Sequence, residues 1–237
     1  MSARTRIEWT HASWNPLTGC TKISPGCAHC YAERMAIRLK ATGAPKYANG
    51  FGLTLHEDVL DLPLKWKKPH SVFVNSMSDL FHKDVPVEFI QKVFEVMKRA
   101  NWHSYHLLTK RSDRLLELSP FLTFDPHITV GVTVENQDHA FRIDQLRQTP
   151  AHNKFLSMEP LLGPVRDMNL EGIDWIYAGG ESGPDARPMD PAWVEEIREQ
   201  CEQSGTGFHL KQWGGTSRNL VEDTAEPPKE LTLFPEY

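Results

Sequence analysis

Segments with the pattern of β-strands alternate with segments typical of α-helices along nearly the whole chain. About eight short apolar runs recur, and most are followed by turn residues and then by a helical pattern. This alternation favours a parallel sheet, because a crossover helix returns the chain to the same edge before each new strand. The expected strands span residues 7–9, 51–56, 72–74, 104–110, 127–136, 154–160, 174–183 and 207–215.

The alternation predicts an α/β fold, most economically a compact (β/α) barrel of the TIM type, complete or partial. The chain has 237 residues, which suits one such domain over residues 1–218 and a polar, proline-bearing tail over residues 219–237. A doubly wound open sheet is the alternative, and both arrangements place the functional site at the carboxyl ends of the strands. The expected helices span residues 31–42, 87–100, 111–118, 139–148 and 191–203.

Three of the four cysteines lie together after the first expected strand. Cys20, Cys27 and Cys30 have the spacing C-x6-C-x2-C within a stretch rich in turn residues, and we call residues 19–30 the cysteine loop. A helical pattern begins at Tyr31, directly after the last cysteine. The unpaired N–H groups and the positive dipole end of a helix N-terminus favour thiolate over thiol.

Four interpretations of these thiols remain open from the residues alone. A disulfide would leave one thiol unpaired, and nothing in the sequence suggests secretion. A zinc ion would need a fourth ligand, which His29 or His11 could supply. The thiols could also be structural and without a ligand. A [4Fe–4S] cluster bound by three thiolates would leave one iron open for another ligand.

The sequence around the cysteines resembles the cluster loop of radical S-adenosylmethionine (SAM) enzymes. The usual spacing in that superfamily is C-x3-C-x-aromatic-C, and His29 falls on the aromatic position, but six residues rather than three separate Cys20 from Cys27. With WNP-x-x-GC, SPGC-x-x-CYAE and a later LLTKR, this variant resembles a phage-type three-cysteine family of radical-SAM-like proteins of unknown function. The likeness to that family covers nearly the whole chain, and the chain is also distantly similar to spore photoproduct lyase.

The resemblance implies two cofactors: a [4Fe–4S] cluster bound by Cys20, Cys27 and Cys30, and SAM bound to the fourth iron, with His29 near the adenine. An external electron donor would reduce the cluster, which would cleave SAM to a 5′-deoxyadenosyl radical that takes a hydrogen atom from a substrate. By analogy with the lesion-repairing branch, we expect a nucleic acid or nucleotide substrate. A separately encoded protein partner is a further expectation.

Polar residues lie at the ends of six successive expected strands, and converging polar groups over an apolar floor are typical of a small-molecule site. Lys110, in LLTKR, resembles a lysine that pairs with the SAM carboxylate in the lesion-repairing branch, although it could simply leave the sheet for solvent. Thr133 falls where the superfamily places contacts to the ribose or methionine part, and the turn NSMSD resembles one near the SAM amino-acid part. The residues predicted to bind the cofactor are His29, Ser76, Ser78, Asp79, Lys110, Thr133 and Glu135.

Glu159 in SMEP and Glu181 in AGGESG end two further expected strands and are the predicted catalytic residues. Either could hold substrate or act as a base, and plain turn residues are the alternative. Residues 179–181 read Gly-Gly-Glu, which binds the SAM amino group in the superfamily. There the motif lies shortly after the cysteine loop, whereas here it comes about 150 residues later, so its role is not transferred.

The overall charge limits the class of protein. Lys and Arg number 26 against 31 Asp and Glu, and the net charge of −5 argues against a protein that coats nucleic acid over its whole surface. The sequence shows neither a membrane-length apolar run nor a signal-peptide core, so we expect a cytoplasmic protein. In that compartment Cys201, within the expected helix 191–203, is predicted to be a small buried residue.

Two hypotheses from other classes compete with the radical SAM enzyme. One is a zinc-binding, non-catalytic module for nucleic-acid or protein interaction. The other is a barrel hydrolase that uses Glu159, Glu181, Asp79 and a histidine and has incidental cysteines.

Overall fold

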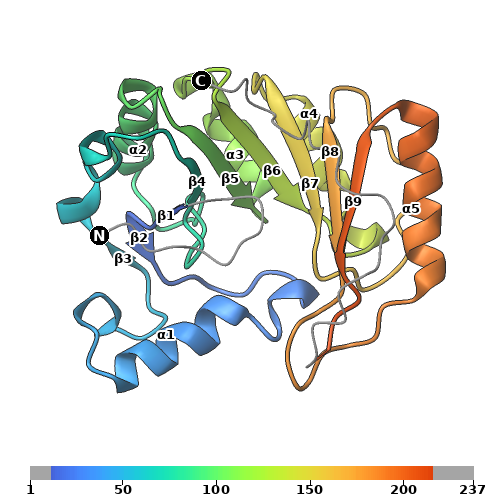
Figure 1. The fold of residues 1–237 in the computed structure, drawn as a ribbon, viewed down its shortest axis with the longest axis horizontal. Coiled ribbons are helices and arrows are strands. Elements are labelled where there is room, and N and C mark those ends of the chain that lie inside the picture. The colour runs from blue at the N-terminus through green and yellow to red at the C-terminus, as the bar shows by residue number, and fades with distance from the viewer. Residues whose placement is uncertain (1–11, 216–237) are drawn as a thin grey trace.

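The computed structural model describes residues 12–215, in which seven strands form one curled parallel sheet (Figure 1). Their spatial order is β1-β4-β5-β6-β7-β8-β9, and every neighbouring pair is parallel. Because β1 and β9 lie at opposite ends of this order, the barrel is partial. The sequence-based prediction allowed either a complete or a partial barrel. The strands are β1 Ala12–Trp14, β4 Ser71–Val74, β5 Ser104–Thr109, β6 Ile128–Thr133, β7 Asn153–Met158, β8 Trp175–Gly179 and β9 Gly207–Gln212.

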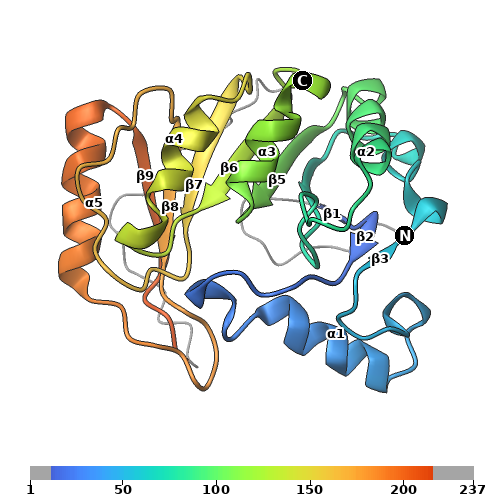
Figure 2. The same ribbon diagram turned by 180° about the vertical axis from the view of Figure 1, so that it is seen from behind.

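The α-helices confirm the expected alternation. Helices α2 to α5 lie on one side of the sheet and share a single hydrophobic core with it, whereas α1 lies beyond one end of the strands (Figure 2). Helix α2 illustrates how a helix joins this core, because Phe89, Val93 and Met97 recur at helical spacing and form its buried face. The helices are α1 Tyr31–Ala41, α2 Val87–Arg99, α3 Ser112–Leu118, α4 Phe141–Arg147 and α5 Pro191–Ser204.

Strand β6 illustrates how the sequence produces the two faces of the sheet. All six of its residues are buried, and the β-branched Ile128, Val130 and Val132 pack into the core shared with the helices. The alternate residues, Thr129, Gly131 and Thr133, therefore face the opposite side of the sheet. The full burial of β6 is typical of a central strand in a parallel sheet.

The expected strand over residues 51–56 is wrong as a member of the main sheet. Only β3 Thr54–Leu55 is a strand, and it pairs antiparallel with β2 Leu17–Thr18. Both residues of β3 are only half-buried, and Leu53 and Leu55 pack against the core of the domain without joining the main sheet. The small β2–β3 pair instead fixes the chain at the start of the cysteine loop.

Three predictions fall on parts of the chain outside the described residues. These are the strand over residues 7–9 and the tail over residues 219–237, together with the domain boundary after residue 218. The first described strand is β1, and the cysteine loop follows it after β2. Within residues 12–215, no helix has the length and apolarity needed to cross a membrane.

The carboxyl ends of the parallel strands all point to one edge of the sheet. The segment between β2 and α1, which contains the cysteine loop, runs across that edge in both views (Figures 1 and 2). The topology therefore brings the three cysteines and the polar strand ends to the same side of the molecule.

Candidate functional site

The cysteine loop begins beside the turn that follows β4 and is fixed there by backbone hydrogen bonds. The Gly19 N–H donates to the Met77 carbonyl at 3.0 Å, and the Cys20 N–H donates to the Phe51 carbonyl at 3.2 Å. A Cβ on Gly19 would lie 2.3 Å from the carbonyl oxygen of Gly52, so only glycine permits this approach, and its φ of +86° also favours glycine. The first cysteine is thus held between the turn after β4 and the segment before β3.

Arg111, between β5 and α3, contacts the first cysteine. Its Nη1 donates to Cys20 Sγ at 3.4 Å, and its Nη2 donates to the Thr21 carbonyl at 3.0 Å. The same guanidinium pairs with Asp79 at 2.9 Å, and both side chains are buried. Burial raises the pKa of the Cys20 thiol, the charge of Asp79 raises it further, and Arg111 partly offsets both.

The carboxylate of Asp79 is fully used within the protein. Besides Arg111 it accepts hydrogen bonds from Thr109 Oγ1 at 2.8 Å, from the Lys110 N–H at 3.2 Å and from the Phe81 N–H at 3.0 Å. Asp79 therefore joins the end of β4 to the end of β5. Together with Arg111 it supports the first part of the cysteine loop.

Glu135, just beyond β6, anchors the middle of the loop. Its fully buried carboxylate accepts a hydrogen bond from the Ser24 hydroxyl and one from Arg142 Nη1 at 2.7 Å. Gly26 packs so closely that a Cβ there would lie 2.5 Å from Glu135 Oε1. A larger residue than glycine at position 26 would force this part of the loop away from β6.

Glu181, just beyond β8, anchors the end of the loop. Its carboxylate lies 2.9 Å from His29 Nδ1 and 2.6 Å from Arg187 Nη2, and Arg187 Nη2 also donates to the Pro25 carbonyl at 2.9 Å. The hydrogen bonds from Arg187, helped by the one from His29, lower the pKa of Glu181 to about 2 against the opposing effect of burial. A group that ionises so readily is suited to holding a cation and is a weak base at neutral pH.

Three polar side chains at the same edge lack such partners. In the described part of the chain, the Lys110 ammonium makes no hydrogen bond or ion pair, and the hydroxyl of Thr133 and the amide of Asn75 are buried without partners. Lys110 follows β5, Thr133 is the last residue of β6 and Asn75 follows β4, and these three strands are neighbours in the sheet. Lys110 is also close enough to Cys27 for its charge to act on the thiol. Burial tends to raise the pKa of Cys27. A backbone hydrogen bond from Ile23, the charge of Lys110 and the Ser24 hydroxyl outweigh burial, and the pKa is lowered overall.

The other predicted site residues are engaged elsewhere. Ser76 exchanges hydrogen bonds with the Asn15 amide, and Ser78 donates to the Leu17 carbonyl at 2.9 Å. Glu159, at the end of β7, pairs with Lys211 Nζ at 2.5 Å. The predicted set thus divides into residues that fix the loop and the β4 turn, a Glu159–Lys211 pair near β9, and the unpaired Lys110 and Thr133.

Sequence reasoning did not identify the arginines as partners of the acidic residues. Arg111, Arg142 and Arg187 each pair with an acidic residue of the predicted site. The available signal was the number of acidic side chains at strand ends, because buried carboxylates generally require a cationic partner. The distances in sequence between Arg111 and Asp79, and between Arg142 and Glu135, are not unusual enough to reveal the pairing.

The three thiols fit a sulfur-ligated metal group by their chemistry. All three are half-buried on one loop, and thiolates are the ligands that iron–sulfur clusters and zinc prefer. No group of three or more His, Cys, Asp or Glu side chains within residues 12–215 is already arranged to hold a metal ion. Cys201 is buried in α5, and burial raises its pKa to about 12, as expected for a structural thiol.

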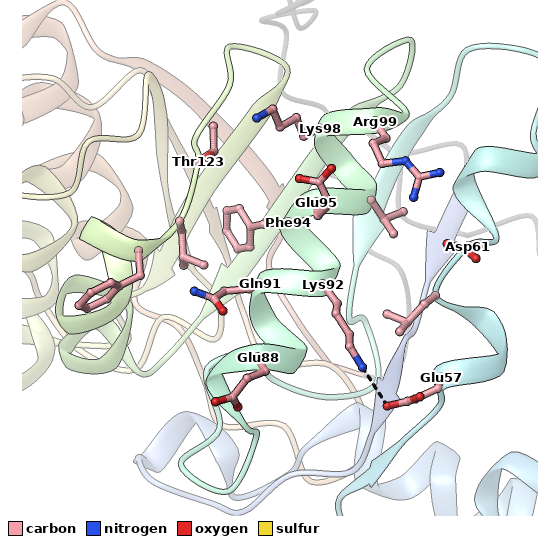
Figure 3. A pocket seen from close by; sticks show the side chains of 14 residues that line it. Glu57, Asp61, Glu88, Gln91, Lys92, Phe94, Glu95, Lys98, Arg99 and Thr123 are labelled. Carbon is pink, nitrogen blue, oxygen red and sulfur yellow. Dashed lines mark hydrogen bonds and ion pairs between the residues drawn. The ribbon is translucent and has the colours of Figure 1, made fainter.

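A separate surface groove lies over α2 (Figure 3). Charged side chains of α2 line it, and Lys92 pairs with Glu57 across it at 3.3 Å. None of the predicted site residues lines this groove, so it is not part of the site at the strand ends.

Comparison with known proteins gives a family and a fold. Residues 4–230 match the model of a family described as "Protein of unknown function (DUF5131)". No curated protein matches the chain. Solved structures of spore photoproduct lyase are similar in fold: the complex with dinucleoside spore photoproduct and a cysteine-to-serine mutant both have a TM-score of 0.54, with 12% and 13% identity. A tyrosine-to-phenylalanine mutant has a TM-score of 0.55 and 12% identity, and each comparison covers 89% of this chain and 78% of the other.

Proposed function

The chain belongs to the DUF5131 family of proteins of unknown function, and we propose that it is a radical SAM enzyme with a [4Fe–4S] cluster bound by Cys20, Cys27 and Cys30. The observation that supports this most directly is the anchoring of a three-cysteine loop across the carboxyl ends of a partial parallel barrel. A fold shared with spore photoproduct lyase is consistent with the proposal. When bound, the cluster would supply the electron for reductive cleavage of SAM to a 5′-deoxyadenosyl radical.

Lys110 is the residue best placed to bind the SAM carboxylate. Its ammonium has no partner among the described residues, and its charge already acts on the Cys27 thiol. An ion pair in a site partly shielded from water is stronger than one on the surface. Thr133, whose buried hydroxyl is also unpaired, would donate or accept one hydrogen bond from the same ligand.

The acidic residues of the predicted site are better suited to positioning than to proton transfer. Asp79, Glu135 and Glu181 fix the beginning, middle and end of the cysteine loop through Arg111, Ser24 and His29. We therefore propose that Glu181 orients the His29 ring, rather than acting as a base. Glu159 remains the candidate carboxylate for contact with substrate.

The substrate is proposed by analogy. One of the matched spore photoproduct lyase structures is a complex with dinucleoside spore photoproduct. A nucleic acid or nucleotide is therefore the proposed substrate class for this chain, together with an external electron donor. A separately encoded protein partner and a cytoplasmic location remain predictions.

The zinc alternative is favoured by one specific contact. The hydrogen bond from His29 Nδ1 to Glu181 leaves Nε2 of the ring available as a fourth ligand. A histidine that binds zinc usually has its other nitrogen hydrogen-bonded to a carboxylate or a carbonyl. The zinc-binding module without catalysis is therefore the second candidate.

Anaerobic purification tests the two candidates against each other. The protein is reconstituted with iron and sulfide, and its visible spectrum, iron, sulfide and zinc contents and its cleavage of SAM under a chemical reductant are measured. The proposed enzyme should contain about four irons, show sulfur-to-iron charge transfer and form 5′-deoxyadenosine. A colourless protein with about one zinc per chain, and no cleavage after reconstitution, would establish the alternative.

Matched cysteine variants localise the metal in the same assay. The triple substitution Cys20→Ala, Cys27→Ala and Cys30→Ala should abolish iron binding. Cys201→Ala, which removes a thiol buried in α5, should leave the iron content unchanged while lowering stability. Equal iron in the triple variant and the wild type would exclude the cysteine loop as the ligand source.

A further inference from the structure

The turn after β4, residues 75–79, contains one polar side chain whose bonding capacity is unused. Ser76 and Ser78 are bonded to Asn15 and Leu17, and Asp79 is bonded to Arg111 and the end of β5. The Asn75 side chain differs from them. Neither its amide nitrogen nor its amide oxygen has a partner in the part of the chain that the structure describes, although the residue is only 4% exposed.

A buried amide without hydrogen bonds lowers the stability of the ligand-free protein. A buried polar group left without a hydrogen bond costs roughly 1–3 kcal/mol, and Asn75 has both a donor and an acceptor unpaired. Its backbone is also in the left-handed region, with φ of +61°, which asparagine tolerates better than most residues. A binding role would explain why a polar side chain occupies this place.

The surroundings of Asn75 hold it in a fixed position. Its N–H donates to the Trp14 carbonyl at 2.9 Å, and the Asn15 amide oxygen accepts from Met77 N–H at 3.1 Å. The Met77 carbonyl in turn binds Gly19, the residue before Cys20. The unpaired amide therefore lies on a rigid turn directly connected to the start of the cysteine loop.

The neighbouring strand ends supply complementary chemistry. Strand β5 pairs with β4 and leads into Lys110, and β6 follows with the unpaired Thr133 hydroxyl. A primary amide offers an acceptor for an ammonium group and donors for a carboxylate. Lys110 adds a positive charge for the carboxylate but cannot accept a hydrogen bond from the ammonium.

We propose that Asn75 binds the zwitterionic amino-acid end of SAM, with its amide oxygen accepting from the ammonium group and its amide nitrogen donating to the carboxylate. The proposal rests on the proposed function and identifies which residue of the 75–79 turn contacts the cofactor. It replaces the expectation that Ser76, Ser78 and Asp79 make this contact, because those three side chains are bonded within the protein.

The test uses Asn75→Gly in the reconstituted holoenzyme. Glycine accepts the positive φ and removes the whole CH2–CONH2 side chain, so the variant should fold and keep its iron. Dissociation constants are measured for SAM and for methylthioadenosine, which lacks the amino-acid end. We expect SAM to bind about tenfold more weakly, as for the loss of one or two hydrogen bonds to charged groups, and methylthioadenosine to bind unchanged.

Two further variants separate binding from backbone effects. Asp167→Gly changes the other non-glycine residue with positive φ in residues 12–215, in an exposed segment, and should alter neither affinity. Asn75→Asp keeps the shape and the acceptor for the ammonium group but replaces the donor to the SAM carboxylate by a negative charge, so it should weaken SAM binding and leave methylthioadenosine binding unchanged.

The outcomes distinguish this inference from the proposed function. Wild-type affinity for SAM in Asn75→Gly, with iron intact, would overturn the role of Asn75 and leave the radical SAM proposal standing. An equal loss of affinity for SAM and for methylthioadenosine, together with a lower melting temperature, would also overturn the role of Asn75. That result would show that the residue supports the fold and does not contact the amino-acid end of SAM. If the wild-type protein binds its cluster but no SAM, the proposed function itself fails.

Discussion

Arg111 Nη1 lies 3.4 Å from Cys20 Sγ, so a buried cation directly faces the first thiol of the cysteine loop. The guanidinium keeps this position because the Asp79 carboxylate, 2.9 Å away, compensates its charge. The pair connects the loop to the ends of β4 and β5 at a single point. Removing either partner should therefore affect both the stability of the fold and the environment of Cys20.

Arg111→Met should be strongly destabilising. It leaves the Asp79 carboxylate buried without its ion-pair partner, a change that typically lowers the free energy of unfolding by about 3–5 kcal/mol. Urea denaturation measures the loss, and the double variant Arg111→Met with Asp79→Asn should recover part of it. Additive effects of the two substitutions would mean that the pair does not act as a unit.

Lys110→Met should weaken SAM binding without removing the iron. The methionine keeps most of the packing of the lysine stem and removes the charge. We expect affinity for SAM to fall roughly tenfold to a hundredfold, or about 1.4–2.8 kcal/mol, in a titration of the reconstituted protein. Lys211→Met removes a strand-end lysine that pairs with Glu159, and it should leave SAM affinity within about twofold. Similar losses in both variants would point to a general charge effect.

Two threonines of β6 provide a matched pair of variants that tests the proposed SAM site at the carboxyl ends of the strands. Thr129 and Thr133 are both buried, lie on the same face of the strand and have unpaired hydroxyls among the described residues. Valine at either position removes an unsatisfied polar group, so each variant should raise the free energy of unfolding by about 1 kcal/mol. Only Thr133→Val should weaken SAM binding, by about threefold to tenfold, because Thr129 lies at the opposite end of the strand. A loss of affinity in Thr129→Val would contradict this assignment.

His106 should make the fold sensitive to mild acid. Burial lowers the pKa of His106 to about 4, against an ordinary value near 6.5, and its Nε2 lies 3.1 Å from Ser71 Oγ. Between these two pH values the unfolded chain binds a proton that the folded protein does not, so stability falls as the pH falls from 6.5 to 4. The expected loss from this group is roughly 3 kcal/mol over that range.

Urea denaturation at pH 7 and pH 4.5 measures this effect. The wild type should lose stability between the two values, and His106→Gln should lose about 2–3 kcal/mol less. An equal loss in both proteins would assign the acid sensitivity to other groups.

The parallel sheet and the helices that cover it could be predicted because their patterns are local. Every residue of β6 except Gly131 is β-branched, and α2 shows buried side chains at helical spacing. The segment 51–56 was assigned to the main sheet incorrectly, because alternation over a few residues does not specify which partner a strand finds. Pairing in this case depends on β2, which lies more than thirty residues earlier.

The cysteine loop and the strand-end acids could also be identified from sequence, but their division of roles could not. Asp79, Glu135 and Glu181 look alike in sequence, and only the positions of Arg111, Arg142 and Arg187 reveal that all three are paired. Asn75 was not selected from its turn, because its unpaired amide becomes apparent only when the partners of Ser76 and Ser78 are known.

The attachment of the cysteine loop to three separate strand ends makes its opening a cooperative event. Contacts through Arg111 at β5, Glu135 at β6 and Glu181 at β8 must break together before the loop can leave the sheet. Such a segment exchanges its backbone amides as one unit, at a rate governed by that single opening rather than by fraying of each residue. The same barrier would slow the release of any metal group once the loop has closed over it.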